Sequence, residues 1–302
     1  MMDLNSLRQF LVVARLEHLS RAADELRVAQ PSLSRTIARM ERDLGTPLFD
    51  RGGRLRLNAA GRLFRAHVER ALGELEAGRR AVAESISEGA GSARMASETF
   101  LTLTGPLAAY KRAHPSVELE LHWSPSEDMA RLLRARHVDL CVSSQPIHAE
   151  GAETVRLFDE EVGVAVPLDH PLAGRTSLSI HELADQPFVT APQGHWLRRL
   201  LDRLFAARGL VPRIVCESDE HGAIADLIGA GLGIGLVPAF ARRKGEHVPA
   251  AWIPVDSPDC RRTVTLSWDT GSHLTAAARQ LRTTLIDWDW NQDRGAGEGE
   301  DP

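Results

Sequence analysis

The chain has 302 residues, a formal net charge of −5, 43% hydrophobic residues and 25% charged residues. This composition excludes a disordered or fibrous protein, and the length is sufficient for more than one domain. The N-terminal residues contain an early acid and no apolar run of signal-peptide length, so we expect a cytoplasmic protein with no membrane partner.

The stretch from Ser20 to Gly45 predicts two short helices at a sharp turn, preceded by another helix, with Ser20 as an N-cap. The last of these three helices has an apolar stripe that should bury against the other two. This stripe consists of Leu33, Ile37, Met40 and Leu44. A different face carries only hydrogen-bond donors, namely Ser32, Arg35, Thr36 and Arg39. Such a face has the chemistry to enter a DNA major groove, although a solvated helix of a bundle is an equal alternative for this helix alone.

A β-hairpin is predicted next, with Gly52-Gly53 as its turn and Leu55 and Leu57 facing inward on the returning strand. Arginines surround its tip at positions 51, 54 and 56. A hairpin wing beside a recognition helix can contact a phosphate or a minor groove, which a plain helical bundle would not need.

The run from Leu7 to Gly61, with FLVVARLEHLSRAADELRVAQPSLSRTIARMERDLGTPLFDR at its centre, resembles the winged helix-turn-helix of LysR-type transcriptional regulators. Asn58 stands where that family more often has Thr, and Ala29 where it often has Ser. The resemblance implies binding of double-stranded DNA through the start of the recognition helix and through the wing. At the start of the recognition helix it implies Gln30, Pro31, Ser32, Ser34 and Arg35. The full set of predicted DNA-binding residues is Ser20, Arg21, Gln30, Pro31, Ser32, Ser34, Arg35, Arg39, Arg51 and Arg54.

The charge distribution agrees with one DNA-binding end. Residues 1–66 contain twelve Arg, no Lys and seven acidic residues, a net charge of +5, so the remainder carries −10. A basic end on an acidic body suits a protein that contacts DNA with one module, and chance asymmetry is the alternative.

A long helix is predicted over residues 59–88, where apolar residues mostly alternate steps of four and three. The row consists of Phe64, Val68, Ala71, Leu75, Gly78, Val82 and Ile86. This spacing is typical of a coiled-coil seam, and the resemblance favours a dimerising linker helix over a helix packed on its own domain. A two-fold dimer would present two recognition helices to a roughly palindromic promoter site.

From residue 89 to about 290, short apolar runs alternate with helical ones, which favours βαβ units and a parallel sheet. We expect two lobes, the first over about 92–161 and 264–290 and the second over about 162–263. The pattern resembles the family's effector-binding domain, which has the fold of periplasmic solute-binding proteins. The expected fold class is therefore α+β multidomain: a winged helix-turn-helix over residues 1–58, a linker helix, a two-lobed α/β effector domain and a disordered tail over 291–302.

Strand ends in the predicted lobes carry hydrogen-bonding, mostly uncharged groups, and ligands of open α/β sheets bind beyond such ends. Together with helix N-termini these groups could hold a small organic anion, although each hydroxyl could instead serve as a helix cap. The candidate effector-binding residues are Ser97, Thr99, Ser124, Ser143, Ser144, Gln145, Thr190, Glu217 and Ser218.

No motif for catalysis or metal binding is found. The three cysteines have no metal-like spacing, the twelve histidines are scattered, and GxGxG at residues 231–235 follows a helix rather than a strand. Cys141 and Cys216 lie in apolar runs, where we expect inert core thiols. We therefore expect no metal, no cofactor and no enzymatic activity.

The sequence as a whole predicts a regulator that binds DNA as a homodimer or homotetramer and is controlled by a small-molecule effector between its two lobes. The resemblance also implies RNA polymerase as a partner. Two alternatives stay open: an enzyme or transport-type binding protein with an N-terminal partner-binding module, and an architectural DNA-binding protein without an effector.

Overall fold

The computed structural model describes residues 2–50, 52, 54–86, 91–149, 151–243, 250–271 and 274–290. Arg51, the end of the predicted linker helix (residues 87–88) and the predicted tail (residues 291–302) lie outside the described residues. The chain divides into two compact units, one comprising residues 1–85 and 134–137 and the other residues 86–133 and 138–302. Within the described ranges, no helix combines the length and the apolar character that a membrane span requires.

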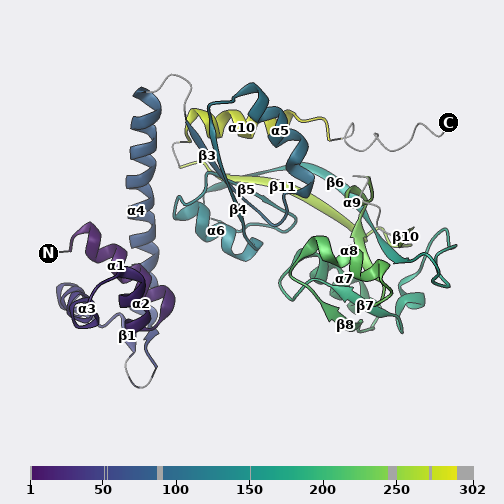
Figure 1. Ribbon diagram of the computed structural model, residues 1–302, viewed down its shortest axis with the longest axis horizontal. Helices are drawn as coiled ribbons and strands as arrows, with labels where there is room; N and C mark the ends of the chain where they lie inside the picture. Colours follow the sequence, from purple (N-terminus) through teal and green to yellow (C-terminus); the bar gives the residue numbers. More distant parts are fainter. Residues whose placement is uncertain are drawn as a thin grey trace. The chain divides into compact units, whose positions relative to one another are not determined.

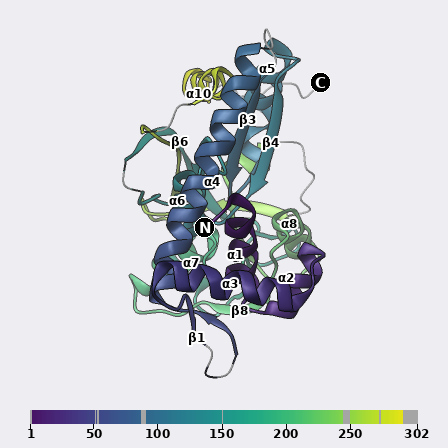
Figure 2. The ribbon, with the colours of Figure 1, turned by 90° about the vertical axis from the view of Figure 1, so that its left-hand side faces the viewer.

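The N-terminal unit is a three-helix cluster with a small hairpin and the start of a long helix (Figures 1 and 2). Its elements are α1 (Leu4–Leu16), α2 (Leu19–Leu26), α3 (Gln30–Leu44), β1 (Phe49–Asp50), β2 (Arg56–Leu57) and α4 (Ala59–Ile86). Phe10 and Val13 of α1 are fully buried among the apolar faces of the other helices. Leu33, Ile37 and Met40 are also buried, which confirms the predicted inner stripe of α3.

The helix ends follow from local hydrogen bonding. Ser20 was predicted to cap α2, but His18 is the N-cap, because its Nδ1 accepts a hydrogen bond from the N–H of Arg21 at 3.3 Å. Helix α2 therefore begins two residues earlier than predicted, and Ser20 lies exposed in its first turn. Ala29 precedes α3 without a side-chain cap, and Gly45 ends α3 at φ 71°.

A half-buried carboxylate holds the wing on the helices. Strands β1 and β2 pair antiparallel, with Phe49 opposite Leu57. The N–H of Leu57 donates to Glu17 Oε1 at 2.9 Å, which ties the returning strand to the end of α1. Asn58 then starts α4, because its Oδ1 accepts a hydrogen bond from the N–H of Gly61 at 2.8 Å. The residue that departs from the family's more common Thr is therefore a working helix cap.

The apolar row along α4 has two parts. Phe64 and Val68 pack into the core of the N-terminal unit, so the prediction that they belong to a dimer seam was wrong. The physical reason is that the first turns of α4 complete the three-helix core. Farther along, Leu75 and Val82 are 51% and 60% exposed, which leaves an apolar strip on a solvent-facing helix.

The C-terminal unit contains two lobes connected by long strands (Figure 1). The first lobe contains β3 (Ser92–Ser97), η1 (Leu101–Leu103), α5 (Thr104–Ala113), β4 (Glu118–Trp123), α6 (Ser126–Arg134), β5 (Leu140–Ser143) and α10 (Ala276–Asp287). The second contains η2 (Ile180–Leu183), β7 (Pro187–Thr190), α7 (Trp196–Ala206), β8 (Arg213–Glu217), α8 (His221–Gly229), β9 (Gly235–Pro238), α9 (Ala239–Arg243) and β10 (Ala250–Pro254). The connecting strands are β6 (Ala152–Pro167) and β11 (Arg261–Asp269).

Strand β6 runs through both lobes. Its first part pairs with β11 in the first lobe, and from Val162 onward it pairs with β9 and β10 in the second. Parallel pairing occurs between β3 and its neighbours β4 and β5, and between β7 and β8, whereas β6 and β11 pair antiparallel with their neighbours. The expected parallel sheet is therefore a mixed sheet, because the chain crosses between the lobes on antiparallel strands.

Each sheet buries its faces under helices. In the first lobe α5 and α10 cover one face, and α6 covers the other (Figure 1). Tyr110 of α5 is buried there, and its hydroxyl donates to the carbonyl of Ala277 in α10 at 2.8 Å. In the second lobe, residues of α7 and α8 pack on β6, β7 and β9. The strand ends of both lobes are thus positioned by separate cores.

Candidate functional site

The first candidate surface is the outer face of α3. Ser32 and Arg35 are exposed, while the intervening Leu33 is 1% exposed, so one side of the helix is committed to the core and the other is free. The guanidinium of Arg35 makes a single described hydrogen bond, from Nε to the carbonyl of Pro31 at 3.3 Å. Its two terminal nitrogens therefore remain able to donate to a base edge.

The remaining predicted DNA-binding residues lie on the same unit. Those on the surface are Ser20, Arg21, Gln30, Pro31, Arg39 and Arg54, while Ser34 is half-buried. Arg39 also reaches Ser6, with Nη2 donating to its hydroxyl at 3.5 Å. Arg54 lies in the hairpin turn between β1 and β2, the position expected of a wing arginine.

The second candidate site is a cavity of about 580 Å³ in the C-terminal unit. Its wall combines residues that follow β3 in the first lobe with the starts of α7 and α8 and the end of β9 in the second. The lining is mainly apolar and includes Phe100, Leu101, Trp123, Trp196, Leu197, Ile224, Leu236 and Val237. Its polar members include Glu98, Thr99, Thr102, His195, Asp219, Glu220 and Arg262.

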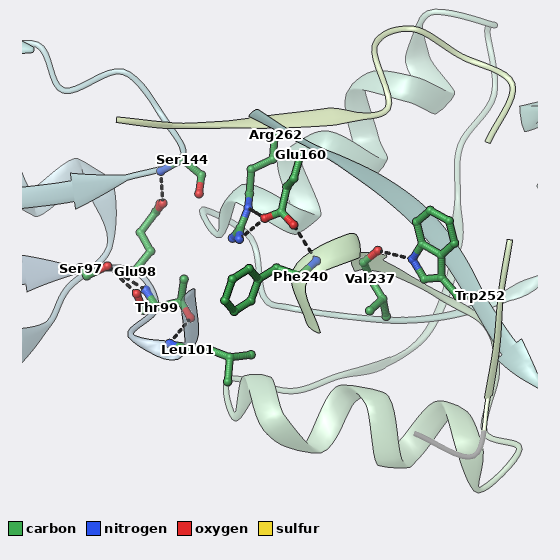
Figure 3. Close-up of polar contacts among 10 residues, drawn as sticks. All are labelled: Ser97, Glu98, Thr99, Leu101, Ser144, Glu160, Val237, Phe240, Trp252 and Arg262. Carbon is green, nitrogen blue, oxygen red and sulfur yellow. Dashed lines mark hydrogen bonds and ion pairs between the residues drawn. The ribbon is translucent and has the colours of Figure 1, made fainter. Parts of the chain in front are cut away.

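The strand-end donors of the first lobe hold a carboxylate of the chain itself. Glu98 is 2% exposed, and its Oε2 accepts a hydrogen bond from the N–H of Ser144 at 2.7 Å (Figure 3). The same oxygen accepts a hydrogen bond from the hydroxyl of Ser143 at 3.3 Å. Its Oε1 accepts from the side-chain amide of Gln145 at 3.0 Å. The same Gln145 nitrogen donates to the carbonyl of Gly194 at 3.2 Å, which links the two lobes.

Of the nine predicted effector-binding residues, only Thr99 lines the cavity. The hydroxyl of Ser97 is used within its own turn, because it donates to the carbonyl of Thr99 at 2.6 Å (Figure 3). The Ser124 hydroxyl likewise donates to the carbonyl of Pro125, and the Ser218 hydroxyl to that of Glu220. In these three residues the hydroxyl donates to a carbonyl of its own turn, so it contacts neither the cavity nor a helix end as a cap.

The predicted residues of the second lobe also lie off the cavity wall. Thr190 is 1% exposed at the end of β7, and its carbonyl accepts the N–H of Ser218 at 3.0 Å. Glu217 forms an ion pair with Arg198 on α7. The cavity begins two residues later, at Asp219, because the chain turns there into α8.

A buried ion pair lies where the chain crosses between lobes. Arg262 on β11 and Glu160 on β6 are 4% and 6% exposed, and Arg262 Nε donates to Glu160 Oε1 at 2.6 Å (Figure 3). Glu160 Oε2 accepts the N–H of Phe240 at 2.8 Å, and the Arg262 guanidinium lies 4.5 Å from the ring centroid of Trp196. These contacts connect both crossing strands to α7 and α9.

Sequence reasoning missed Glu98, Glu160 and Arg262. Glu98 could have been found, because it stands between Ser97 and Thr99 at the end of a predicted strand. Glu160 and Arg262 carry no local signal, since their pairing depends on the register of two strands about a hundred residues apart. Thr102 was also missed; its buried hydroxyl has no hydrogen-bond partner among the described residues.

The cysteines do not form part of either surface. Burial raises the pKa of the Cys141 thiol far above its ordinary value, and it raises the pKa of Cys260 to about 12. The prediction of a core thiol is confirmed for Cys141, which is buried, whereas Cys216 is only half-buried on β8. No cluster of three metal-ligating side chains occurs among the described residues.

Comparison with known proteins identifies both units. Residues 4–62 match the family model of the bacterial regulatory helix-turn-helix proteins of the lysR family, and residues 87–290 match the LysR substrate binding domain. Two relatives in Bacillus subtilis (strain 168) are similar over almost their whole length. The uncharacterised HTH-type transcriptional regulator YybE is 31% identical over 293 residues, covering 94% of this chain and 98% of that protein. The transcriptional dual regulator GltC is 30% identical over 290 residues, covering 94% and 97%.

A solved structure of full-length CbnR complexed with its target DNA shares the fold, with a TM-score of 0.67 at 21% identity over 94% of this chain and 99% of that one. The expected α+β multidomain fold, with an N-terminal helix-turn-helix domain and a C-terminal effector domain, is thus confirmed. The chain belongs to the LysR family of bacterial transcriptional regulators.

Proposed function

We propose that this regulator binds double-stranded DNA in a sequence-specific manner through the outer face of α3, with the wing on the backbone, and that a small molecule in the cavity controls it. The observation that carries the proposal is the division of α3 into a buried apolar side and an exposed side of hydrogen-bond donors. Gln30, Ser32, Ser34 and Arg35 would read bases from the start of the helix, the part that enters the major groove in helix-turn-helix proteins.

The wing would contribute affinity rather than sequence preference. Arg54 in the hairpin turn is exposed, and arginines placed beside a recognition helix neutralise phosphates. The predicted role of Arg51 is the same, although its position lies outside the described residues.

The exposed part of the apolar row on α4 would form the contact between two copies. Leu75 and Val82 point a strip of apolar surface at solvent, and a second copy of the same helix could cover it. Such a homodimer, or a homotetramer built from two of them, would place two α3 helices on a roughly palindromic promoter site. Contact with RNA polymerase at that promoter stays a prediction of the family resemblance.

The cavity would take the effector, because its volume falls in the range of small-molecule sites and its wall is built from both lobes. A ligand that binds one arrangement of the lobes more tightly than another would shift the regulator between two states. Glu98 and Arg262 line this cavity together with Thr99, the one predicted effector-binding residue on its wall, and these three are the proposed polar contacts.

The test measures binding of the full chain to the intergenic DNA beside its own gene. Fluorescence anisotropy over a series of salt concentrations reports the affinity. We expect binding that survives unrelated competitor DNA and weakens as salt rises. Arg35→Ala should lower the preference for that DNA by roughly tenfold or more, because a bidentate base contact contributes about 1–3 kcal/mol of discrimination.

Arg112→Ala is the matched control, since Arg112 is an exposed arginine on α5 in the C-terminal unit. It removes the same charge and should leave the preference unchanged. Unaltered preference in a folded Arg35→Ala protein would refute the base-reading role of α3.

A further inference from the structure

The strand-end groups of the first lobe that were expected to receive an effector carboxylate are already in use. Ser144 and Gln145 donate to the two oxygens of Glu98, and these contacts hold the carboxylate in a 2% exposed position. In the opposite wall, the N–H of Leu197 in the first turn of α7 donates to Nδ1 of His195 at 3.3 Å. An anionic ligand would have to displace Glu98 from its donors or lie beside its negative charge, and both are unfavourable.

The described charges of the wall are mainly negative. Glu98, Asp219 and Glu220 line the cavity, and Arg262 is the one guanidinium among the lining side chains that the structure describes. Arg262 already forms an ion pair with Glu160, so it adds no uncompensated positive charge. A cation entering this space would therefore meet a favourable potential, and an anion an unfavourable one.

Aromatic surface adjoins the carboxylate. The indole N–H of Trp123 donates to the backbone carbonyl of Glu98 at 3.0 Å, which fixes its ring beside that residue while 56% of Trp123 stays exposed. Aromatic faces attract cations, and the rest of the wall is apolar. The arrangement provides a charge partner at one point and room for an apolar body elsewhere.

We propose that the cavity selects a small organic cation, with an ammonium group beside Glu98 and Trp123 and an apolar, ring-sized body against the remaining wall. Glu98 Oε1 accepts a single described hydrogen bond, from Gln145, and so has capacity for another donor. The inference rests on the proposed function, because it names the class of effector that the same cavity takes. It replaces the organic anion expected from the sequence.

Isothermal titration calorimetry of the full chain tests this selection with three probes that share an indole ring and differ in charge. The probes are tryptamine as the cation, tryptophol as the neutral alcohol and indole-3-acetate as the anion. We expect tryptamine to bind the most tightly and indole-3-acetate the most weakly, with at least about a tenfold difference in Kd between them.

Glu98→Gln should reduce that difference severalfold, because it removes the charge and keeps the size of the side chain. Glu118→Gln is the matched control: Glu118 is an exposed carboxylate on β4 that does not line the cavity, so the difference should persist. Thermal melts establish that each variant is folded. If Glu98→Gln does not fold, the order of the three probes on the unaltered chain decides the question.

Three outcomes would overturn the inference: no measurable binding of tryptamine, binding of indole-3-acetate as tight as that of tryptamine, or an unchanged difference in folded Glu98→Gln. DNA binding measured on the same preparations separates this failure from failure of the proposed function. Specific DNA binding with a reversed probe order would refute the ligand class alone, whereas absence of specific DNA binding would refute the proposed function.

Discussion

At the scale of single residues, two buried carboxylates define the cavity region of the C-terminal unit. Glu98 gathers donors from the end of β5 and, through Gln145, reaches Gly194 in the second lobe. Glu160 gathers Arg262 and the start of α9. In both cases a buried negative charge is matched by donors from distant parts of the chain, which is the condition under which buried charge is tolerated.

The pair Glu160–Arg262 gives a prediction for stability. Glu160→Gln should lower the free energy of unfolding of the C-terminal unit by about 3 kcal/mol, because it leaves the guanidinium buried without its counter-charge. Urea unfolding followed by circular dichroism measures the loss. Glu161→Gln, one residue along β6 and exposed, should change stability by less than about 0.5 kcal/mol. Equal stability of the two variants would contradict the importance assigned to the pair.

At the scale of elements, α4 performs two tasks in sequence. Its first turns complete the core of the N-terminal unit, and its later turns expose an apolar strip. Gly61 lies in the part of α4 that packs on the core, because a Cβ atom there would lie 2.1 Å from the carbonyl oxygen of Leu48. Gly78 lies in the later, exposed part of α4, where a Cβ atom would have no neighbour within 4 Å.

These two glycines predict opposite effects of the same substitution. Gly61→Ala should destabilise the N-terminal unit by about 2 kcal/mol, because the wing must move away from the helix. Gly78→Ala should stabilise the helix by about 1 kcal/mol, because Ala has the higher helix propensity and no contact opposes it. Chemical unfolding of both variants measures the difference in sign. A Gly61→Ala protein as stable as the unaltered chain would show that the wing does not pack closely on α4.

At the scale of the whole molecule, DNA affinity should depend on association of two chains. Leu75→Asp places a charge in the exposed strip of α4, so we expect it to convert dimers to monomers. DNA affinity should then fall by about a hundredfold, because two linked recognition helices bind one DNA site more tightly than a single helix does. Analytical ultracentrifugation and DNA titration provide the two measurements.

Ala66→Asp is the control for this prediction, because Ala66 is exposed on the opposite side of α4 at 3.6 residues per turn. It should stay dimeric. A Leu75→Asp protein that remains dimeric and binds DNA normally would refute the proposal that this strip of α4 joins two copies.

The local sequence determined the N-terminal unit almost completely. The apolar stripe of α3, the uncapped Ala29 and the left-handed Gly45 were all predictable, because the period of a helix and the chemistry of its ends depend on residues a few positions apart. The exposed donors of α3, including Arg35, follow from the same periodicity. Even the misplaced cap of α2 was an error of two residues, with His18 in place of Ser20.

Tertiary structure alone decided the cavity and the use of each polar group around it. A hydroxyl at a strand end has the same local sequence whether it meets a ligand, as was predicted for Ser143, or a carboxylate such as Glu98. The register of β6 against β11 brings Glu160 to Arg262, and the residues next to each in the sequence do not predict that pairing. Helical periodicity is a property of neighbours in the chain, whereas the charge and shape of the cavity come from segments that are adjacent only after folding.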